Sequence, residues 1–310
     1  MRSNSSAILS RPPLLSPSRA GVGWGLLGVV GFSFTVPFTR VAVQDGGMSP
    51  LFVGCGRAVV AALLAAGALA VTGQRPPRAA QWARLTVVAG GVVLGFPVLT
   101  SFALATASAS HSAVVIALLP AVTAVTAALR GHERPPVRFW LAVLAGALAA
   151  VVFTSSPSGL GGLRWSDLLL LGAVLAAGLG YAEGGLLARE LGAWQTISWA
   201  LVLSAPLAAV LAAVAMAAHP PTATPAGWGA FAYLGAVSMF LAFFGWYRGL
   251  AIGPMARVSQ IQLVQPVLSI CWAGLFLGEA VTWSTLLAGV TVIACAGLAV
   301  RTRLEPRPSP

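Results

Sequence analysis

Long apolar segments separated by short links fill almost the whole chain, and they constrain the fold more than any other feature. A bilayer core of about 30 Å takes about 20 helical residues per crossing. We expect a transmembrane helix over each of ten runs: 21–39, 50–72, 84–106, 111–129, 138–156, 167–187, 194–217, 227–248, 257–277 and 284–301. The pattern therefore predicts an all-α membrane protein with ten transmembrane helices.

The composition excludes a water-soluble protein. Of 310 residues, 58% are apolar and 8% are charged, and the mean hydropathy is +0.88, whereas soluble domains carry about 25% charged residues. The net charge of +11 comes from arginines that stand singly or in small groups between the apolar runs. This distribution is typical of membrane topology, not of a nucleic-acid surface. We expect the lipid bilayer, and no nucleic acid, as a partner.

The arginines also predict the orientation. If the N-terminus is inside, fifteen of the 18 arginines lie on the inner side, the outer side receives Arg40 and Arg164, and Arg57 falls within the second run. Positive charge collects on the cytoplasmic side of membrane proteins. We expect a multi-pass protein of the cell (cytoplasmic or inner) membrane, with a disordered cytoplasmic tail over 1–20 and a second cytoplasmic tail over 302–310.

The second half of the chain repeats the first. One shift of the sequence aligns Pro120 with Pro266 and Glu133 with Glu279. Five crossings in each half invert the second half in the membrane, so we expect a 5+5 inverted-topology repeat over 21–157 and 165–301. Inverted repeats build many secondary transporters, whose substrate site lies near the midplane between the halves.

Several short segments resemble parts of one known family. Residues 246–254, followed by 265–266 and 277–279, resemble the end of an EamA domain, and residues 105–120 with Glu133 resemble the same segment of a preceding EamA domain. The first half departs from the pattern, because His132 stands where a glycine usually precedes the acidic residue.

Two tandem EamA domains resemble the drug/metabolite transporter superfamily, and the resemblance covers about 21–301. It implies transport, commonly efflux of amino acids or related metabolites driven by the proton gradient. It also implies that helices 1, 3, 4, 6, 8 and 9 enclose a cavity at the midplane. It does not identify the substrate.

Arg57 is the first candidate for the substrate cavity. It lies about seven residues into the second run, which places it about 10 Å from the outer end at 1.5 Å per residue. A charge at the bilayer centre costs at least ~2.5–3.5 kcal/mol, so we expect the side chain to face the bundle interior. There it either binds a carboxylate or phosphate of the substrate or anchors the structure through helix-end carbonyls or a neighbouring acid.

Glu183 is the acidic residue that lies deepest in an apolar run. A helix that starts near Asp167 places it about 24 Å along, toward the cytoplasmic side. A carboxyl group taken out of water can carry a proton, which makes Glu183 the proton-coupling candidate. The alternative is a packing role, with a salt bridge to a cytoplasmic arginine such as Arg189 or Arg248.

Further candidates come from the ninth, first and eighth runs. Gln262 and Gln265 are three residues apart and share one face of a helix, so they are substrate-cavity candidates. Phe34 and Tyr247 come from aromatic-rich stretches that can line an apolar pocket. Candidate hinges are the mid-helix prolines Pro37, Pro120 and Pro266.

Other classes of function have little support in the sequence. HExxH, GxxxxGK[ST] and charged rings for a channel are absent, and all three histidines fall in links, where we expect solvated side chains. The three cysteines lie in apolar runs. We expect no catalytic residues, no metal and no cofactor.

The sequence thus favours a secondary transporter over an enzyme. We expect export of amino acids or related small metabolites by alternating access, with proton coupling as an option. The alternatives are an uncoupled facilitator or a transporter of drugs or other metabolites, and an intramembrane enzyme has less support. The partners are a small-molecule substrate and, with coupling, protons. The bundle is a monomer or a homodimer.

Overall fold

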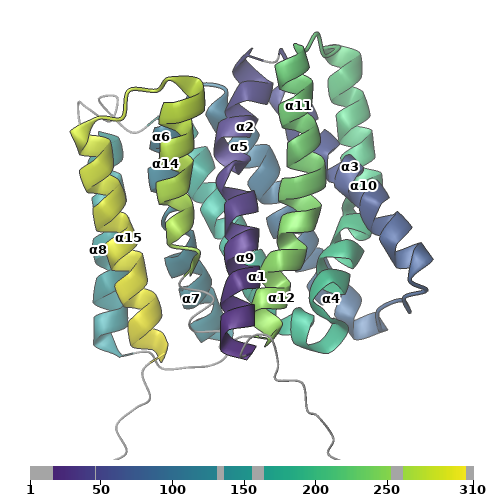
Figure 1. Cartoon of the computed structure of the whole chain (residues 1–310), viewed down its shortest axis with the longest axis horizontal. Coiled ribbons are helices and arrows are strands. Elements are labelled where there is room, and N and C mark those ends of the chain that lie inside the picture. The colour runs from purple at the N-terminus through teal and green to yellow at the C-terminus, as the bar shows by residue number, and fades with distance from the viewer. Residues whose placement is uncertain (1–16, 46, 131–135, 156–163, 253–260, 305–310) are drawn as a thin grey trace, which may run out of the picture.

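The computed structural model describes residues 17–45, 47–130, 136–155, 164–252 and 261–304, and this part of the chain is helical with no strand. The helices stand side by side in one bundle, with α1 starting and α15 ending at the same end (Figure 1). α1 begins at Pro17 and α15 continues to Leu304. The predicted tails are therefore shorter than expected, and their outer parts, 1–16 and 305–310, lie outside the described residues.

The first half of the chain forms five helical stretches, three of which are built from more than one helix. Their bounds are α1 (Pro17–Ser33), α2 (Thr35–Arg40) and η1 (Val41–Asp45); α3 (Pro50–Val71); α4 (Ala79–Val88), η2 (Ala89–Gly95) and α5 (Phe96–Leu104); α6 (Ala109–Ile116) and α7 (Leu119–Arg130); and α8 (Val137–Ser155). The segments η1 and η2 are π-helical.

The described part of the second half is also helical. Its bounds are α9 (Trp165–Leu191); α10 (Ala193–Ala218); α11 (Pro225–Tyr233), η4 (Leu234–Leu241, π-helical) and α12 (Ala242–Ile252); α14 (Val264–Leu277); and α15 (Trp283–Leu304). Within the described residues, eight stretches are long and apolar enough to cross a membrane, and Val137–Phe153 and Val264–Leu277 are shorter apolar helices. These fall on the ten predicted runs, while the count of ten crossings stays a prediction.

Capping residues explain where several helices begin and end. Ser49 precedes α3, and its hydroxyl accepts a hydrogen bond from the Phe52 N–H at 3.3 Å. Thr224 caps α11 in the same way. Each of these caps is followed by a proline at the first helical position, where no backbone N–H is needed. Gly278 ends α14 with φ at +64°, a conformation that glycine adopts without strain.

The three candidate hinge prolines share one position. Pro37, Pro120 and Pro266 each lie in the first turn of a helix that starts after an interruption, namely α2, α7 and α14. A proline in the first turn costs no hydrogen bond, which explains why new helices start there. Pro206, by contrast, lies inside the continuous helix α10. Bending at the three prolines stays a prediction.

Helices from the two halves pack against each other throughout. α3 packs along α10, α1 along α12, and α8 along α15, and α9 packs against α4, η2 and α5. Small residues allow the closest approaches: a Cβ at Gly28 of α1 would lie 2.6 Å from the backbone nitrogen of Trp246. Small residues at helix contacts are characteristic of membrane bundles.

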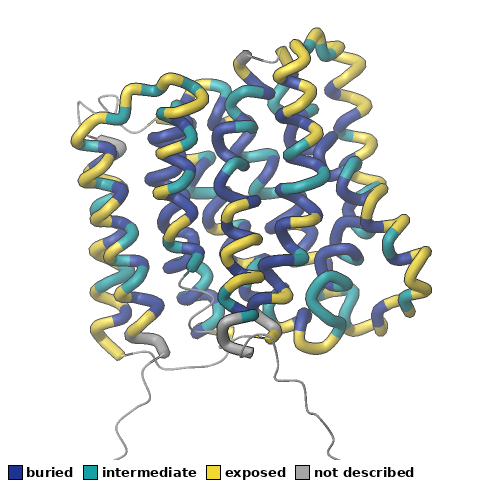
Figure 2. The backbone as a smooth tube through the Cα atoms, in the orientation of Figure 1, coloured by how far each residue is buried: buried dark blue, intermediate teal, exposed yellow. Residues whose placement is uncertain are grey.

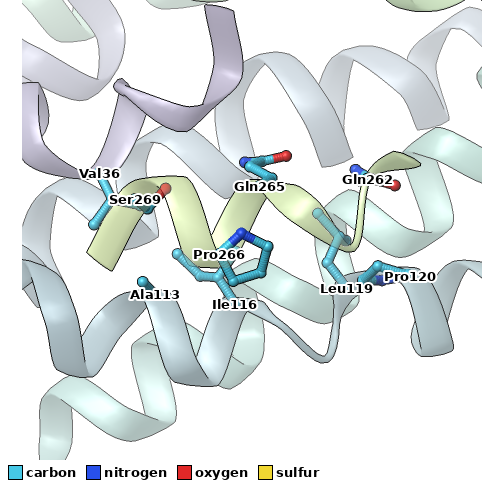
Figure 3. Close-up of a pocket in the computed structure, with 9 residues that line it drawn as sticks. All are labelled: Val36, Ala113, Ile116, Leu119, Pro120, Gln262, Gln265, Pro266 and Ser269. Carbon is cyan, nitrogen blue, oxygen red and sulfur yellow. The ribbon is translucent and has the colours of Figure 1, made fainter. Parts of the chain in front are cut away.

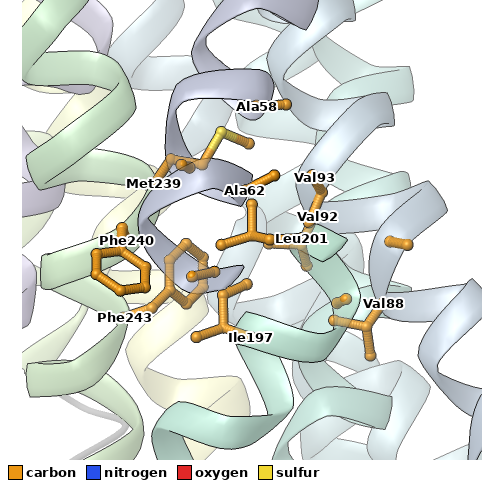
Figure 4. Packing of buried hydrophobic residues seen from close by; sticks show 14 of the residues in the cluster. Ala58, Ala62, Val88, Val92, Val93, Ile197, Leu201, Met239, Phe240 and Phe243 are labelled. Atoms are coloured by element: carbon orange, nitrogen blue, oxygen red, sulfur yellow. The ribbon is translucent and has the colours of Figure 1, made fainter. Parts of the chain in front are cut away.

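The largest buried cluster joins α3, α10 and the π-helical segment η4 with its neighbours (Figure 4). Met239 and Phe243 meet Ala62 and Leu201 there. Large apolar side chains such as Leu63 and Leu144 instead cover the outside of the bundle, where Figure 2 shows exposed backbone along the outer helices. An apolar outside with a packed interior is what a multi-pass membrane protein requires.

Candidate functional site

Two narrow crevices meet in the middle of the bundle. The cavity volume is about 30 Å³ in the larger and about 10 Å³ in the smaller, so in this conformation they have room for water molecules and not for a metabolite. They share Val36, Leu119 and Gln265, so they are contiguous. Ala177 and Tyr181, which line the larger crevice, lie near the middle of the long helix α9. The crevices therefore lie about halfway along the helices and take their linings from both halves of the chain.

Arg57 borders the larger crevice from α3. Its side chain is buried, with 2% exposed, and Nη1 donates to the Thr39 hydroxyl at 3.3 Å. Nε and Nη2 are buried and find no hydrogen-bond partner among the described residues. A buried guanidinium group without its partners is costly, and its free N–H groups are suited to a carboxylate or phosphate. The observed contact is to a hydroxyl, not to the carbonyl or acid that an anchor role would use.

Hydroxyl groups opposite Arg57 complete the polar part of the larger crevice. Thr35 and Ser238 lie 2.7 Å apart between their hydroxyl oxygens, and both line the crevice with Tyr181. The sequence analysis did not select these three residues. Other hydroxyl groups in the spans, such as that of Thr100, donate only to a carbonyl in the preceding turn of their own helix. The residue type alone therefore does not show which Ser and Thr side chains line a crevice.

Gln262 and Gln265 both line the smaller crevice, beside Pro120, Pro266 and Ser269 (Figure 3). Gln265 also borders the larger crevice. Nε2 of Gln262 is buried and has no hydrogen-bond partner among the described residues. The two glutamines therefore offer amide groups to a bound molecule at the point where both interrupted helices, α6–α7 and α14, come together.

Phe34 and Tyr247 lie apart from the two crevices. The Phe34 ring stacks on Trp272 with centroids 4.7 Å apart and also contacts Phe38. Tyr247 is buried, and its hydroxyl sits against Gly184, where a Cβ would lie 2.4 Å away. These contacts pack helices together, and a cavity role for either residue stays a prediction.

Glu183 lies at one end of the bundle and is buried among arginines of the first half. Its two carboxylate oxygens pair with Arg84 of α4 and Arg130 of α7, and Arg84 also pairs with Glu190 at 2.5 Å. We call these four residues the arginine end. Glu183 does not line either crevice.

The structure confirms the salt bridge of Glu183 to arginines of the predicted cytoplasmic side, but the partners are Arg84 and Arg130 and not the two examples, Arg189 and Arg248. Six residues along a helix turn the side chain by about 120°, so Arg189 leaves α9 on a different face from Glu183. Arg248 instead lies over the Trp24 ring, 5.1 Å from its centroid. The actual partners are distant in sequence and could not be found from spacing.

His111 is in the first turn of α6, at the opposite end of the bundle. In Figure 1 this end is at the top, where α14 is joined to α15. Its Nε2 is 2.6 Å from Oδ1 of Asp167, and both side chains are buried. Glu279 follows α14 and accepts hydrogen bonds from the backbone N–H groups of Ala109 and Ser110 at 2.7 and 2.8 Å. We call His111, Asp167 and Glu279 the histidine end.

The prediction of a solvated His111 in a link was wrong. α6 begins at Ala109, two residues before the predicted span, so His111 is within its first turn. Its partner Asp167 is 56 positions away and belongs to the other half of the chain. Neither fact is visible in the local sequence. Glu133 and His132 lie outside the described residues.

No three His, Cys, Asp or Glu side chains gather as metal ligands in the part of the chain that the structure describes. Cys55 is buried, while Cys271 is exposed and Cys295 is partly exposed. The absence of a cofactor and of catalytic residues stays a prediction.

Comparisons with known proteins agree with this architecture. The model of the EamA-like transporter family matches twice, over residues 19–155 and 164–301. A Bacillus subtilis (strain 168) protein described as "Uncharacterized transporter YdeK" is 42% identical over 289 residues, which cover 90% of this chain and 97% of that protein.

A solved structure described only as "Crystal structure of protein" has the same fold, with a TM-score of 0.61, 19% identity and coverage of 91% of this chain and 96% of that one. The fold, the double family match and the curated relative lead to one assignment. The chain belongs to the EamA-like transporter family and is a multi-pass membrane transporter of the drug/metabolite type.

Proposed function

We propose that the protein is a secondary transporter that exports a small metabolite with an anionic group, such as an amino acid or a related compound, by alternating access. The observation that carries the proposal is Arg57. It is buried inside the bundle, borders the larger crevice and has two donor groups, Nε and Nη2, without a partner among the described residues. A bound anion would satisfy both groups.

The lining of the crevices supports this substrate class. Phe32, Met239 and Phe243 offer an apolar wall beside Arg57, and no Asp or Glu is among the described residues that line either crevice. A cationic drug would therefore meet a positive charge and no carboxylate. The amide groups of Gln262 and Gln265 can bind a further polar group of the substrate.

The pairing of helices supports ten crossings and an inverted repeat with units over 21–157 and 165–301. α3 and α10 are the second stretches of their halves, and α8 and α15 are the fifth, so each of these pairs maps onto itself when the halves are exchanged. The pair of α1 with α12 maps onto the pair of α9 with α4, η2 and α5. A pseudo-two-fold axis in the membrane plane would produce this pattern.

Polar contacts between the halves lie at both ends of the crevice region. α7 and α9 are joined by Arg130 and Glu183, and α6 and α9 are joined by His111 and Asp167. In alternating access one end opens while the other stays closed. By the arginine count, the arginine end faces the cytoplasm and both termini lie there. Glu183 then acts as a gate residue. Transport measurements decide whether it also couples transport to protons.

The test is transport by the purified protein in proteoliposomes that contain a pH-sensitive dye, with pools of amino acids and small organic acids as probes. We expect Arg57→Gln to abolish uptake of the active pool. The same variant should melt at an equal or higher temperature, because it removes a buried charge that lacks partners. Arg248→Gln, at an exposed arginine, is the matched control and should transport normally.

Three outcomes would contradict parts of the proposal. Normal transport by Arg57→Gln would move the substrate site elsewhere. If the wild-type protein transports no compound from any pool, amino acids and small organic acids are not its substrates. Substrate-dependent proton flux that is lost in Glu183→Gln would establish coupling through this residue, whereas uptake without proton movement would leave a facilitator in which Glu183 is a gate residue alone.

A further inference from the structure

Equivalent positions of the two proposed repeats meet at the larger crevice. The shift of 146 positions that aligns Pro120 with Pro266 also relates further pairs of residues that line this crevice: Thr35 and Tyr181, Val92 and Ser238, and Leu119 and Gln265. A site on the axis between inverted repeats would be lined by both members of each pair. The side chains at paired positions can therefore be compared directly, because they border the same space.

The paired positions differ in polarity. Three polar residues of the crevice lining correspond to aliphatic residues under this shift: Ser238 to Val92, Gln265 to Leu119 and Arg57 to Leu203. The two halves of the chain therefore offer different groups at equivalent places. A molecule with one polar end has a preferred orientation in such a crevice.

The polar residues of the first half and Ser238 are joined by hydrogen bonds and close packing. Nη1 of Arg57 donates to the Thr39 hydroxyl at 3.3 Å, and that hydroxyl donates to the backbone carbonyl of Thr35 at 2.7 Å. The hydroxyl oxygens of Thr35 and Ser238 are 2.7 Å apart. A Cβ at Gly235, three residues before Ser238, would lie 3.3 Å from the Arg57 carbonyl oxygen, so α3 and η4 are in direct contact here. We call Arg57, Thr39, Thr35 and Ser238 the polar cluster.

The hydroxyl groups of Thr35 and Ser238 can bind an oxygen atom of a ligand. A hydroxyl group has one donor hydrogen and two acceptor lone pairs. One of the two hydrogens lies between the two hydroxyl oxygens. The other hydrogen is able to donate to a ligand, and the lone pairs left over are able to accept from one. An oxo group and a hydroxyl group of a ligand therefore both fit this pair.

The charge of the larger crevice decides which ligands fit. The Arg57 guanidinium group keeps its proton, and no Asp or Glu is among the described residues that line this crevice. An acid with a single negative charge neutralises the guanidinium group. An α-amino acid brings an ammonium group as well, so the buried site keeps a net positive charge. Charges away from water are costly unless each has a partner.

We propose that the substrate is a small organic acid that has a hydroxyl or oxo oxygen next to its carboxylate and no ammonium group. This inference rests on the proposed function and narrows its substrate class. Nε and Nη2 of Arg57 share one edge of the guanidinium group, so they bind both carboxylate oxygens. The hydroxyl groups of Thr35 and Ser238 bind the neighbouring oxygen, and Phe32 and Phe243 pack against the apolar remainder.

The larger crevice has to widen before this substrate can enter, since its cavity volume is about 30 Å³. In alternating access the helices of a repeat move largely as rigid bodies. Each helix then keeps the same face turned toward the crevice, so α2, α3 and η4 continue to present the polar cluster. The assignment of substrate groups depends on which side chains line the crevice and not on its present width.

The first test compares three acids that share one carbon skeleton. Leucic acid has a hydroxyl group where leucine has its ammonium group, and isocaproic acid has neither. The rise in melting temperature of the purified protein in detergent gives the affinity for each acid without transport. Uptake above that of protein-free liposomes gives the KM. We expect leucic acid to bind at least about tenfold more tightly than leucine and about fivefold more tightly than isocaproic acid.

The second test removes single hydroxyl groups and takes its control from the repeat. Ser238→Ala and Thr35→Val should each lower the preference for leucic acid over isocaproic acid about fivefold, because isocaproic acid has no oxygen for the hydroxyl pair to bind. Val92→Ala changes the position equivalent to Ser238 in the same crevice and should leave this preference unchanged. Ser238→Thr, which keeps a hydroxyl group, should retain it. A purely structural role of Ser238 would affect both acids alike.

The outcomes separate this inference from the proposed function. Leucine bound more tightly than leucic acid, together with an inactive Arg57→Gln, would overturn the inference and leave the proposed function standing. An unchanged preference in both Ser238→Ala and Thr35→Val would also overturn it, and Thr35→Val decides alone if Ser238→Ala does not fold. Normal transport of leucic acid by Arg57→Gln would remove the proposed function and the inference together.

Discussion

The arginine end and the histidine end close the same helix pair, α6–α7 against α9, with different chemistry. At the arginine end one carboxylate, that of Glu183, pairs with two guanidinium groups. At the histidine end one carboxylate, that of Asp167, pairs with one imidazole. The comparison shows that contact between the two halves of the bundle is made by guanidinium groups at one end and by an imidazole at the other.

The two ends also differ in their contact with water. The side chains of Arg84 and Arg130 are 28% and 54% exposed, whereas His111 and Asp167 are nearly fully buried. Exposed arginines can be hydrated when their partner moves away. The buried histidine end instead depends on internal hydrogen bonds, including the Glu279 cap on α6. Opening should therefore cost less at the arginine end per broken contact.

Of the substitutions that test this comparison, Glu183→Gln should lower the unfolding free energy most. The variant leaves both arginines without their carboxylate, and we expect a loss of about 2–3 kcal/mol in unfolding free energy. This is below the ~3–5 kcal/mol of a fully buried pair, because the arginines are partly exposed. Unfolding of the purified protein in detergent measures the loss. A loss no larger than that of Glu190→Gln would show that the buried carboxylate contributes no more to stability than the exposed one.

A smaller effect should follow from Glu279→Gln. The neutral amide keeps one acceptor, while the charged cap on the N–H groups of Ala109 and Ser110 is lost, so we expect about 1 kcal/mol of destabilisation. Hydrogen exchange should become faster in the first turn of α6 and stay unchanged in α7. Equal changes in both helices would show that Glu279 stabilises the bundle globally and not the histidine end.

The smallest effect should come from Glu190→Gln. Glu190 is exposed and pairs with Arg84, which keeps its contact with Glu183 in the variant. Exposed pairs contribute little because water screens them. We expect the melting temperature to stay within experimental error of the parent protein. A fall as large as that of Glu183→Gln would mean that the arginine end works as one network of four charges.

Parts of the candidate site could be reasoned out from the sequence, and parts could not. Arg57 was selected because a charge in an apolar run is costly. The spacing of Gln262 and Gln265 predicts a shared helix face, and both do line the smaller crevice, but Gln262 precedes α14, which begins at Val264. Local arguments of this kind cannot identify Thr35 and Ser238, because their hydroxyl groups are in contact although the residues are 203 positions apart in the sequence. Aromatic content also does not say whether the Phe34 ring lines a crevice, and the structure shows it stacked on Trp272.

The amino-acid sequence by itself determined that the chain is helical and belongs in a membrane, because hydropathy and the length of a bilayer crossing act on each segment independently. It also determined the starts of several helices, because caps and prolines act within one turn. Only the tertiary structure decided that Glu183 pairs with Arg84 and Arg130 and that His111 meets Asp167. Those contacts depend on how separate helices are rotated and packed, and packing is a property of the whole bundle rather than of any one segment.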